Sequence, residues 1–578
     1  MKFLDWDVCG YDRVVAVRFY RSGINPLAAV FLASRGIADL DAARTILGDR
    51  PAEIFDPFLL ADMDKAVTRI KAAVENGEHI AIYGDYDVDG MTSCALLASW
   101  LTSKSAVFEV YIPGRLGEGY GLNQPALDLL KSHGVELVIT VDCGITAIEE
   151  ALYARRLGLG LVITDHHECK KELPTADAVI DPKRLDCGYP YKTLAGVGVV
   201  FKLVCALELE TGADEVFRRY SDLVAVGTIA DVMPVSGENR ELIRRGLQIL
   251  NSNPRPGLHS LIREAAPDLG RITTTTVGYT VAPKLNAAGR MGKPDLSVGL
   301  LLTNDSAEAE RLTAELCRLN AERRSLEVGI YDEAESMLPE GGPDGPIILS
   351  QRGWHQGVTG IVAAKIAERH FAPAVIISID DNGIGRGSCR SYGPFKIYGA
   401  LKTCEDLLSN YGGHDMAAGV TIAEENIGEF RRRITSYYHN FIETTPGLGL
   451  TVDFEVENPE LLSAQNVGAL AQLEPFGAGF PPPRLCIRDA TITSVFSIGS
   501  GKHTRLRIEK SGTFFDCIYF SMSSEDLGAA PGMLADVAFE PQINDFRGRS
   551  SVQLRLFDIH LMRPAERKEP EVRSQESE

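Results

Sequence analysis

Three aspartates on alternate positions directly follow a short apolar stretch, and they constrain this chain more than any other feature. The stretch His79–Tyr83 has the β-branched and aromatic content of a buried strand, and Asp85, Asp87 and Asp89 come after it. Carboxylates this close repel one another and raise each other's pKa unless a cation neutralises them. The pattern therefore predicts a strand that delivers carboxylates to a metal ion.

A calcium loop of the EF-hand type also begins with Asp-x-Asp-x-Asp-Gly, so it is the first alternative. That loop needs a bidentate Glu at its twelfth position, and here the twelfth residue is Leu96. An EF-hand loop also follows a helix, whereas His79–Tyr83 has the pattern of a strand. These two differences exclude a calcium sensor.

The length and composition are those of an ordinary globular protein with several domains. The chain has 578 residues, of which 45% are hydrophobic, and its eleven cysteines include no Cys-x-x-Cys pair, which argues against a zinc ribbon or a disulfide framework. We expect a cytoplasmic protein without a membrane partner, because no apolar stretch is long enough to span a bilayer and Met1–Asp7 has no signal core. The net charge of −20 means that any nucleic-acid contact must rest on local basic patches.

Breaks rich in Pro and Gly, and changes in the spacing of apolar residues, divide the chain into six expected segments. They are a cap on the first domain at 1–60, an α/β domain with a parallel sheet at 61–304, a connector helix at 305–340, a second α/β domain at 341–447, a small β-barrel at 448–562 and a disordered tail at 563–578. Asp305 is expected to cap the connector helix, and the Pro/Gly-rich stretch Phe476–Pro483 is interpreted as a break before the barrel strands.

Two further polar clusters follow apolar runs of the first α/β domain. Asp142 comes after the run at 135–140, and the triplet Asp165-His166-His167 comes after the run at 159–164. Parallel strands gather their ligands at their carboxyl ends, so these residues are expected to share one crevice with the three aspartates, and Asp231 is a further candidate. Carboxylates with imidazole suit Mn²⁺ or Mg²⁺, and two ions about 3.5–4 Å apart can hydrolyse a phosphodiester.

These residues, in this order, resemble the DHH phosphoesterase superfamily, which is named for the triplet Asp165-His166-His167. Pro283–Met291 is similar to the segment that distinguishes the RecJ family of single-strand-specific exonucleases within that superfamily. Other segments are similar to the DHH-associated domain, namely Trp354–Ala363, Gly387–Ser391 and Tyr411–Gly419. The resemblance runs from about residue 60 to about residue 560.

The resemblance implies a role for each polar residue of the site. The ligands of two Mn²⁺ or Mg²⁺ ions would be Asp85, Asp87, Asp89, Asp142, His166 and Asp231. Asp142 would bridge the two ions, His167 would contact the scissile phosphate, and Asp165 would orient a histidine. Asn286 and Arg290 would hold the nucleic-acid backbone. A terminal nucleotide or phosphate would be gripped by Arg390, Ser391, Gly412, Gly413 and His414, since glycines let backbone N–H groups approach an anion and Arg offers a planar fork.

The C-terminal barrel resembles an OB-fold, a common platform for single-stranded nucleic acid. Basic residues gather in its strand-like segments, together with four aromatic residues: Phe514, Phe515, Tyr519 and Phe520. Aromatic residues in the barrel alternate with polar residues, so at least half of these four are expected in the barrel core rather than on a stacking surface.

The resemblance as a whole implies a 5′-to-3′ exonuclease specific for single-stranded DNA. It would release mononucleotides by two-metal-ion hydrolysis in recombination and repair, together with a single-strand-binding protein and a helicase. One alternative is a DHH-type phosphoesterase acting on short oligonucleotides or cyclic dinucleotides, which would not need the long barrel. Another is a catalytically silent repair or replication scaffold, but here every expected acidic and histidine position is filled.

Overall fold

The computed structural model describes residues 5–114, 121–267, 270–339, 343, 345–442, 449–546 and 549–562. The chain forms two compact units. The larger unit comprises residues 52–446 and 477–480, and the barrel unit comprises the remaining residues. Among the described residues, no helix combines the length and apolarity needed to cross a bilayer. The tail at 563–578, for which we expected disorder, lies outside the described residues.

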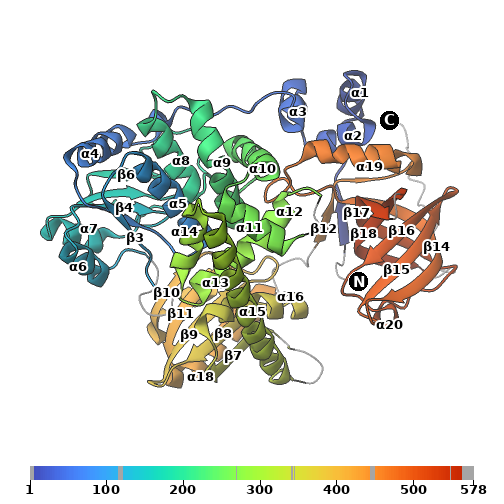
Figure 1. The fold of residues 1–578 in the computed structure, drawn as a ribbon. Coiled ribbons are helices and arrows are strands. Elements are labelled where there is room, and N and C mark those ends of the chain that lie inside the picture. The colour runs from blue at the N-terminus through green and yellow to red at the C-terminus, as the bar shows by residue number, and fades with distance from the viewer. Residues whose placement is uncertain are drawn as a thin grey trace, which may run out of the picture. The chain divides into compact units, whose positions relative to one another are not determined.

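The larger unit begins with a five-stranded sheet in which all neighbouring strands are parallel (Figure 1). Its strands, in spatial order, are β3 (Phe108–Tyr111), β2 (Ile80–Tyr83), β4 (Leu137–Val141), β5 (Gly160–Thr164) and β6 (Ala178–Ile180). Both faces are covered, since Ile80 and Ile82 of β2 belong to one hydrophobic cluster and Ala81 and Tyr83 belong to another. The parallel α/β sheet predicted from the sequence is confirmed.

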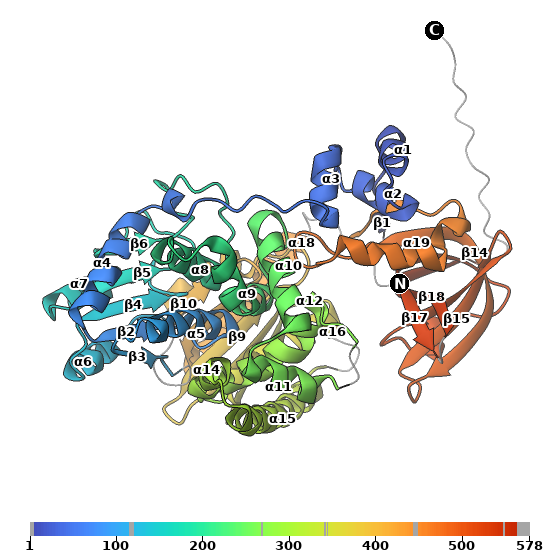
Figure 2. The same cartoon turned by 45° about the horizontal axis from the view of Figure 1, so that its top comes forward.

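Helices form a layer on each face of this sheet, as Figure 2 shows from a second direction. One layer contains α4 (Met63–Asn76), α5 (Val88–Ser103) and α8 (Gly196–Leu207), with α9 (Ala213–Ala230) packed on α5 and α8 and α10 (Gly237–Ser252) packed on α9. The other layer contains α6 (Gln124–Ser132) and α7 (Ile148–Arg156).

A series of helices leads from this domain to the connector. They are α11 (Pro256–Ala265), α12 (Thr274–Thr276), a π-helical turn (Val277–Val281), α13 (Ala282–Arg290) and α14 (Pro294–Leu302). The connector is α15 (Ser306–Ser336), and the Asp305 side chain accepts a hydrogen bond from the Glu308 N–H at 2.8 Å. The predicted cap and long connector helix are therefore confirmed.

The second α/β domain contains a mixed five-stranded sheet. Its elements in chain order are β7 (Ile347–Arg352), α16 (Gln356–His370), β8 (Ala374–Ile379), β9 (Ile384–Arg390), α17 (Ile397–Lys402), β10 (Leu408–Gly413), β11 (Ala417–Ala423) and α18 (Ile427–Ile442). The strand order is β10-β11-β9-β8-β7, and β7 and β8 alone among these neighbours are parallel.

The barrel unit contains a closed five-stranded barrel with the connectivity of an OB-fold, as predicted. Its elements are β12 (Gly449–Val452), β13 (Phe454–Glu455), α19 (Ala464–Ala469), β14 (Leu485–Ile498), β15 (His503–Lys510), β16 (Thr513–Tyr519), α20 (Ser524–Leu527), β17 (Leu534–Phe546) and β18 (Arg549–Met562). Closure comes from pairing of β14 with both β15 and β17. Phe515 and Tyr519 are buried and Phe514 and Phe520 are about half exposed, so half of these rings belong to the core.

The N-terminal residues belong to the barrel unit, whereas the sequence suggested a cap on the first α/β domain. They form β1 (Asp5–Val8), α1 (Arg13–Arg21), α2 (Pro26–Ser34) and α3 (Leu40–Leu47). Strand β1 pairs in parallel with β12, and the Arg35 guanidinium donates to the buried Asp453 carboxylate. Asp453 also accepts a hydrogen bond from the Arg484 N–H at 2.8 Å. Because Arg484 directly precedes β14, this one carboxylate joins the N-terminal helices to the start of that barrel strand.

Replacing Asp453 by Ala should lower the free energy of unfolding of the barrel unit by about 2–4 kcal/mol, because Arg35 would lose the partner of a largely buried charge. Differential scanning calorimetry or urea denaturation measures the change. Glu457→Ala is the matched control, since its ion pair with Arg13 is exposed on both sides, and it should change stability by less than about 0.5 kcal/mol. Equal effects of the two substitutions would contradict the role given to Asp453.

Candidate metal centre

The candidate site lies where three neighbouring strands of the parallel sheet end. Strands β2, β4 and β5 are adjacent, and they lead to Asp85, Asp142 and Asp165 respectively. All three carboxylates are buried, with at most 4% of each residue exposed. The sheet edge therefore brings together side chains that lie far apart in the chain.

A tight turn between β2 and α5 places the other two aspartates of the first cluster. Asp87 is the N-cap residue of α5, where its carboxylate accepts from the Gly90 N–H at 3.0 Å, and Asp89 lies in the first helical turn. A Cβ at Gly90 would lie 2.5 Å from the Asp85 carbonyl oxygen, so this turn requires glycine. The turn keeps the carboxylates of one short segment at one site.

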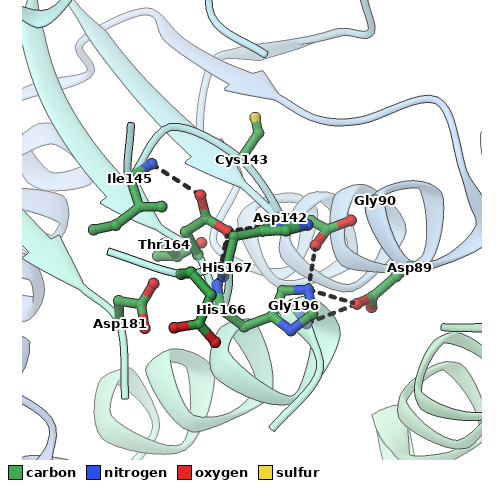
Figure 3. Close-up of polar contacts among 12 residues, drawn as sticks. Asp89, Gly90, Asp142, Cys143, Ile145, Thr164, His166, His167, Asp181 and Gly196 are labelled. Atoms are coloured by element: carbon green, nitrogen blue, oxygen red, sulfur yellow. Dashed lines mark hydrogen bonds and ion pairs between the residues drawn. The ribbon is translucent and has the colours of Figure 1, made fainter. Parts of the chain in front are cut away.

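The N-terminus of α8 supports the Asp89 carboxylate. The Gly196 N–H donates to one oxygen at 2.7 Å (Figure 3). The Val197 N–H donates to the other oxygen at 2.8 Å. A Cβ on Gly196 would lie 2.5 Å from an Asp142 oxygen, so a larger residue would displace that carboxylate. The same glycine thus stabilises the buried negative charge of Asp89 and leaves room for Asp142 beside it.

His166 is the centre of the cluster. Its Nε2 atom lies 3.1 Å from Asp142, 3.6 Å from Asp231 and 3.9 Å from Asp89. Asp231 is the C-cap residue of α9, and its carboxylate is the most exposed of these three. The tertiary structure thus brings the predicted ligand Asp231 to the same imidazole nitrogen as the strand-end residues.

Potential ligand atoms form three overlapping groups whose members lie within 4.8 Å of one another. The groups are Asp85 with Asp87 and Asp142, Asp89 with His166 and Asp231, and Asp142 with His166 and His167. All six predicted ligands occur in these groups. Their overlap provides enough donor atoms in one place for two cations.

The electrostatics of the cluster fit a divalent cation. Burial and repulsion by neighbouring carboxylates raise the pKa values of Asp89 and Asp142 well above the usual range, and they raise the pKa of Asp231 to about 7. Burial, together with the charge of His167, lowers the pKa of His166 to about 3, so its imidazole is neutral, as metal coordination requires. Mutually repelling carboxylates around a neutral imidazole form an oxygen-rich site suited to Mn²⁺ or Mg²⁺.

His167 has the opposite electrostatic character. Its Nδ1 atom lies 2.7 Å from the buried Asp165 carboxylate, which also accepts from the Ile145 N–H at 2.8 Å and the His166 N–H at 2.7 Å. Figure 3 shows His167, Ile145 and His166 around this group. Burial alone would lower the pKa of His167, but the hydrogen bond and charge of Asp165 raise it to about 9. Asp165 therefore holds a half-buried, protonated histidine beside the predicted ligands.

Comparison with known protein families agrees with this geometry. Residues 79–228 match the DHH family N-terminal domain, residues 344–440 match the DHHA1 domain and residues 452–558 match the RecJ OB domain. The single-stranded-DNA-specific exonuclease RecJ of Bacillus subtilis (strain 168) is 39% identical over 538 residues, which cover 93% of this chain and 68% of the relative. The chain belongs to the RecJ family.

Solved RecJ structures share the fold along nearly the whole chain. The crystal structure of RecJ from Thermus thermophilus in complex with Mn²⁺ superposes with a TM-score of 0.81 at 30% sequence identity and covers 96% of this chain and 79% of its own. The complex of RecJ from the same organism with Mg²⁺ gives a TM-score of 0.77 at 29% identity, covering 96% and 78%. Both metals expected from the sequence thus occur in RecJ structures.

In this RecJ-family chain, the predicted substrate residues of the second α/β domain meet at one end of its sheet. Arg390 ends β9 and pairs with Ala417, while Gly413 ends β10 and pairs with Ala418 of the same strand, β11. Gly412 precedes Gly413 on β10, and the His414 N–H closes the hairpin by donating to the Ala417 carbonyl at 2.8 Å. The Ser391 hydroxyl donates to the Phe395 carbonyl, so this side chain is already engaged in holding its own loop.

The other two predicted substrate residues, Asn286 and Arg290, lie on α13, next to the metal cluster. A Cβ on Gly289 would lie 2.0 Å from the Tyr86 carbonyl oxygen, so α13 packs directly on the turn that carries Asp85 and Asp87. Arg290 donates to the Gly357 carbonyl of α16 at 3.0 Å. Arg290 therefore joins α13 to the second α/β domain, a structural role that the sequence did not indicate.

Sequence reasoning missed Asp181, which follows β6 at the same edge of the sheet. It is fully buried, and burial raises its pKa to about 7. The strand-end rule that selected Asp142 would also have selected Asp181, because Ala178–Ile180 has the pattern of a strand. The Gly196 and Val197 N–H groups were missed as well, and nothing in the local sequence indicates that they support Asp89.

We predict that Asp231→Asn makes the metal-free protein more stable at pH 8, because it removes one charge from a cluster of repelling carboxylates. The gain in free energy of unfolding should be on the order of 1–3 kcal/mol, equivalent to one or two pKa units. Calorimetry in a chelator, repeated with Mn²⁺, should show a smaller metal-induced rise in Tm for the variant.

Asp214→Asn is the control, since Asp214 is fully exposed on the same helix, α9. It should leave both melting temperatures within about 1 °C of wild type. A metal-free Asp231→Asn protein that melts below wild type would argue against electrostatic strain in the cluster.

Proposed function

We propose that this protein is a single-stranded-DNA-specific exonuclease that degrades its substrate from the 5′ end and releases mononucleotides by two-metal-ion hydrolysis. The single observation that carries the proposal is the convergence of Asp142, Asp231 and Asp89 on His166, with His167 alongside, in a RecJ-family chain that includes the OB domain. This geometry suits phosphodiester hydrolysis better than simple binding.

In the proposed mechanism, the ligands are Asp85, Asp87, Asp89, Asp142, His166 and Asp231. Asp142 would be able to serve either ion, because its carboxylate belongs to two of the three groups of close ligand atoms, and the family resemblance implies the same shared role. When bound, the two ions supply Lewis-acid activation of water and of the phosphoryl oxygens. The residues of the chain would hold these ions at an edge of the sheet where Asp85, Asp89 and Asp142 are buried.

His167 is proposed to stabilise the negative charge that develops on the scissile phosphate. Asp165 engages Nδ1 and keeps the ring protonated, so the Nε2 side of the imidazolium is the side that can donate to a phosphate oxygen. Asp165 acts by orienting His167, in the same way that carboxylates orient histidines in other hydrolytic sites.

The substrate-binding roles are proposed for three regions of the chain. Asn286 and Arg290 would contact the backbone near the metal cluster. The end of the second sheet, with Arg390, Ser391 and the Gly412-Gly413-His414 turn, would hold the terminal nucleotide. The barrel would bind the strand further along, where Arg507 packs over the half-exposed Phe514 with 5.1 Å between its guanidinium carbon and the ring centre.

The biological setting follows as part of the same proposal. A single-strand exonuclease needs a separated strand, so we propose that it acts with a helicase and a single-strand-binding protein in recombination and repair. The cytoplasm is the proposed place of action. The proposed functional parts are the DHH domain at 61–304, the connector at 305–340, the DHH-associated domain at 341–447 and the OB domain at 448–562.

His166→Ala and Asp87→Ala should each reduce cleavage of single-stranded DNA by more than about 1,000-fold while strand binding stays within about threefold, because both remove metal ligands rather than strand contacts. Digestion assays and fluorescence anisotropy measure the two properties separately. The exposed His133, which pairs with Glu109, gives a control, and His133→Ala should keep full activity. Cleavage at the wild-type rate by His166→Ala would remove this residue from the ligand set.

Arg290→Ala should weaken single-strand binding and reduce the slope of log K against log salt by about 0.7, the value of one phosphate contact on a single strand. Binding measured from low to high salt gives this slope. Arg311→Ala on α15, which breaks only an exposed ion pair with Glu308, should leave it unchanged. If the affinity fell but the slope stayed the same, Arg290 would have only the structural role of its hydrogen bond to Gly357 and would not contact a phosphate.

A Mn²⁺-dependent digestion time course on end-labelled single and double strands tests the function itself. We expect early release of labelled mononucleotide from a 5′-labelled single strand and late release from a 3′-labelled one. Faster turnover of dinucleotides than of long strands would support the oligonucleotide phosphoesterase alternative. Binding without any shortening of the strand would support the silent scaffold.

A further inference from the structure

The segment Gly477–Phe480 leaves the unit to which its neighbours in sequence belong. Residues 447–476 and the residues from Pro481 onward belong to the barrel unit, but these four residues belong to the larger unit. The sequence indicates only a Pro/Gly-rich break here. In the structure the segment is an ordered turn, in which Gly477 and Phe480 exchange backbone hydrogen bonds of 3.0 and 3.1 Å.

The turn packs on residues that follow α9. The Val235 N–H donates to the Ala478 carbonyl at 2.7 Å, and a Cβ on Gly477 would lie 2.5 Å from the Val235 Cγ2 atom. Gly479, with φ +73°, approaches Pro234, and the Phe480 ring lies 4.7 Å from the buried Arg240 guanidinium carbon. The contact is therefore both hydrogen-bonded and closely packed, and it leaves no room for a larger residue at 477.

Pro234 and Val235 belong to the short turn that begins at the proposed metal ligand Asp231. Directly after Asp231, Val232 adopts a left-handed conformation with φ +56°, which is unfavourable for a β-branched residue. Such a conformation persists only where the surrounding structure holds it. The Met233 N–H anchors one side of the turn on the Thr228 carbonyl at 3.2 Å, and the Gly477–Phe480 turn contacts the other side.

We propose that Gly477–Phe480 is a positioning segment for Asp231, and that its packing on Val235 sets the affinity of the metal centre. This inference rests on the proposed metal-binding function. The segment reaches no reacting atom itself. It acts through the strained turn 231–235, because a displacement of Val235 shifts the carboxylate that faces His166. Partners that orient a metal ligand typically change metal affinity or activity by about 10- to 100-fold when they are removed.

Gly477→Ala tests the proposal, because its added methyl group collides with Val235. Calorimetric titration with Mn²⁺ in the absence of DNA should show affinity reduced by about 10-fold or more. Gly468→Ala is the matched control, since a Cβ at Gly468 meets no atom within 4 Å, and it should bind Mn²⁺ as wild type does. Wild-type affinity in a folded Gly477→Ala protein would overturn the proposal.

A second substitution separates positioning from general damage. In a Val235→Ala background the collision is relieved, so Gly477→Ala should there change Mn²⁺ affinity by less than about threefold. A full loss in both backgrounds would overturn the proposed route through Val235. If Gly477→Ala does not fold, Phe480→Leu gives the milder test, with an expected severalfold loss of affinity, and unchanged affinity would again reject the proposal.

These measurements do not depend on nuclease activity. A wild-type protein that binds no Mn²⁺ would refute the proposed metal centre itself. A wild-type protein that binds Mn²⁺ while the Gly477→Ala protein binds it equally well would refute only the positioning segment.

Discussion

Repulsion among buried carboxylates is the constraint on which the rest of this structure depends. Asp85, Asp89 and Asp142 lie at the edge of a sheet with almost no exposure to water, where burial and neighbouring negative charges raise the pKa values of Asp89 and Asp142. The parallel sheet between two helical layers is rigid enough to hold them there. Divalent cations remove this repulsion, so stability and metal binding are coupled in this domain.

Close backbone approaches make that arrangement possible. A side chain at Gly90 would collide with the Asp85 backbone carbonyl, and one at Gly196 would collide with the Asp142 carboxylate. A side chain at Gly289 would likewise collide with the Tyr86 carbonyl and push helix α13 away. Asp142 itself has a φ of +61°, and Val232, next to Asp231, has a φ of +56°. Asp142 and the neighbour of Asp231, both at proposed metal ligands, are thus held in a left-handed conformation, as is common where side chains must be aimed at a functional site.

The net charge of −20 and the proposed nucleic-acid substrate are compatible because a phosphate backbone needs basic groups only where it binds. Acidic side chains occur in the buried cluster and in surface ion pairs, such as that of Glu308 with Arg311. Basic and aromatic groups occur together on the barrel strands, where Arg507 packs over Phe514. Local composition, rather than the total charge, decides where a phosphate backbone can bind.

The sequence by itself determined the parallel sheet, the connector helix and most of the candidate site. Strand periodicity and the rule that ligands gather at strand ends place Asp85, Asp142 and His166 together, because both signals lie within a few adjacent residues. The N-cap of α15 at Asp305 could also be predicted, because Asp305 and Glu308 lie only three residues apart in the sequence. The family resemblance added the assignment of Asp231, whose local sequence alone was ambiguous.

Only the tertiary structure decided which distant segments support these elements. The ion pair between Arg35 and Asp453 joins residues 418 positions apart in the chain, and it makes the N-terminal helices part of the barrel unit. The Gly196 and Val197 N–H groups on Asp89, and the packing of Ala478 on Val235, likewise connect positions with no shared local pattern. A hydrogen bond between remote backbone groups leaves no periodic signal in either segment, so it becomes visible only once the chain is folded.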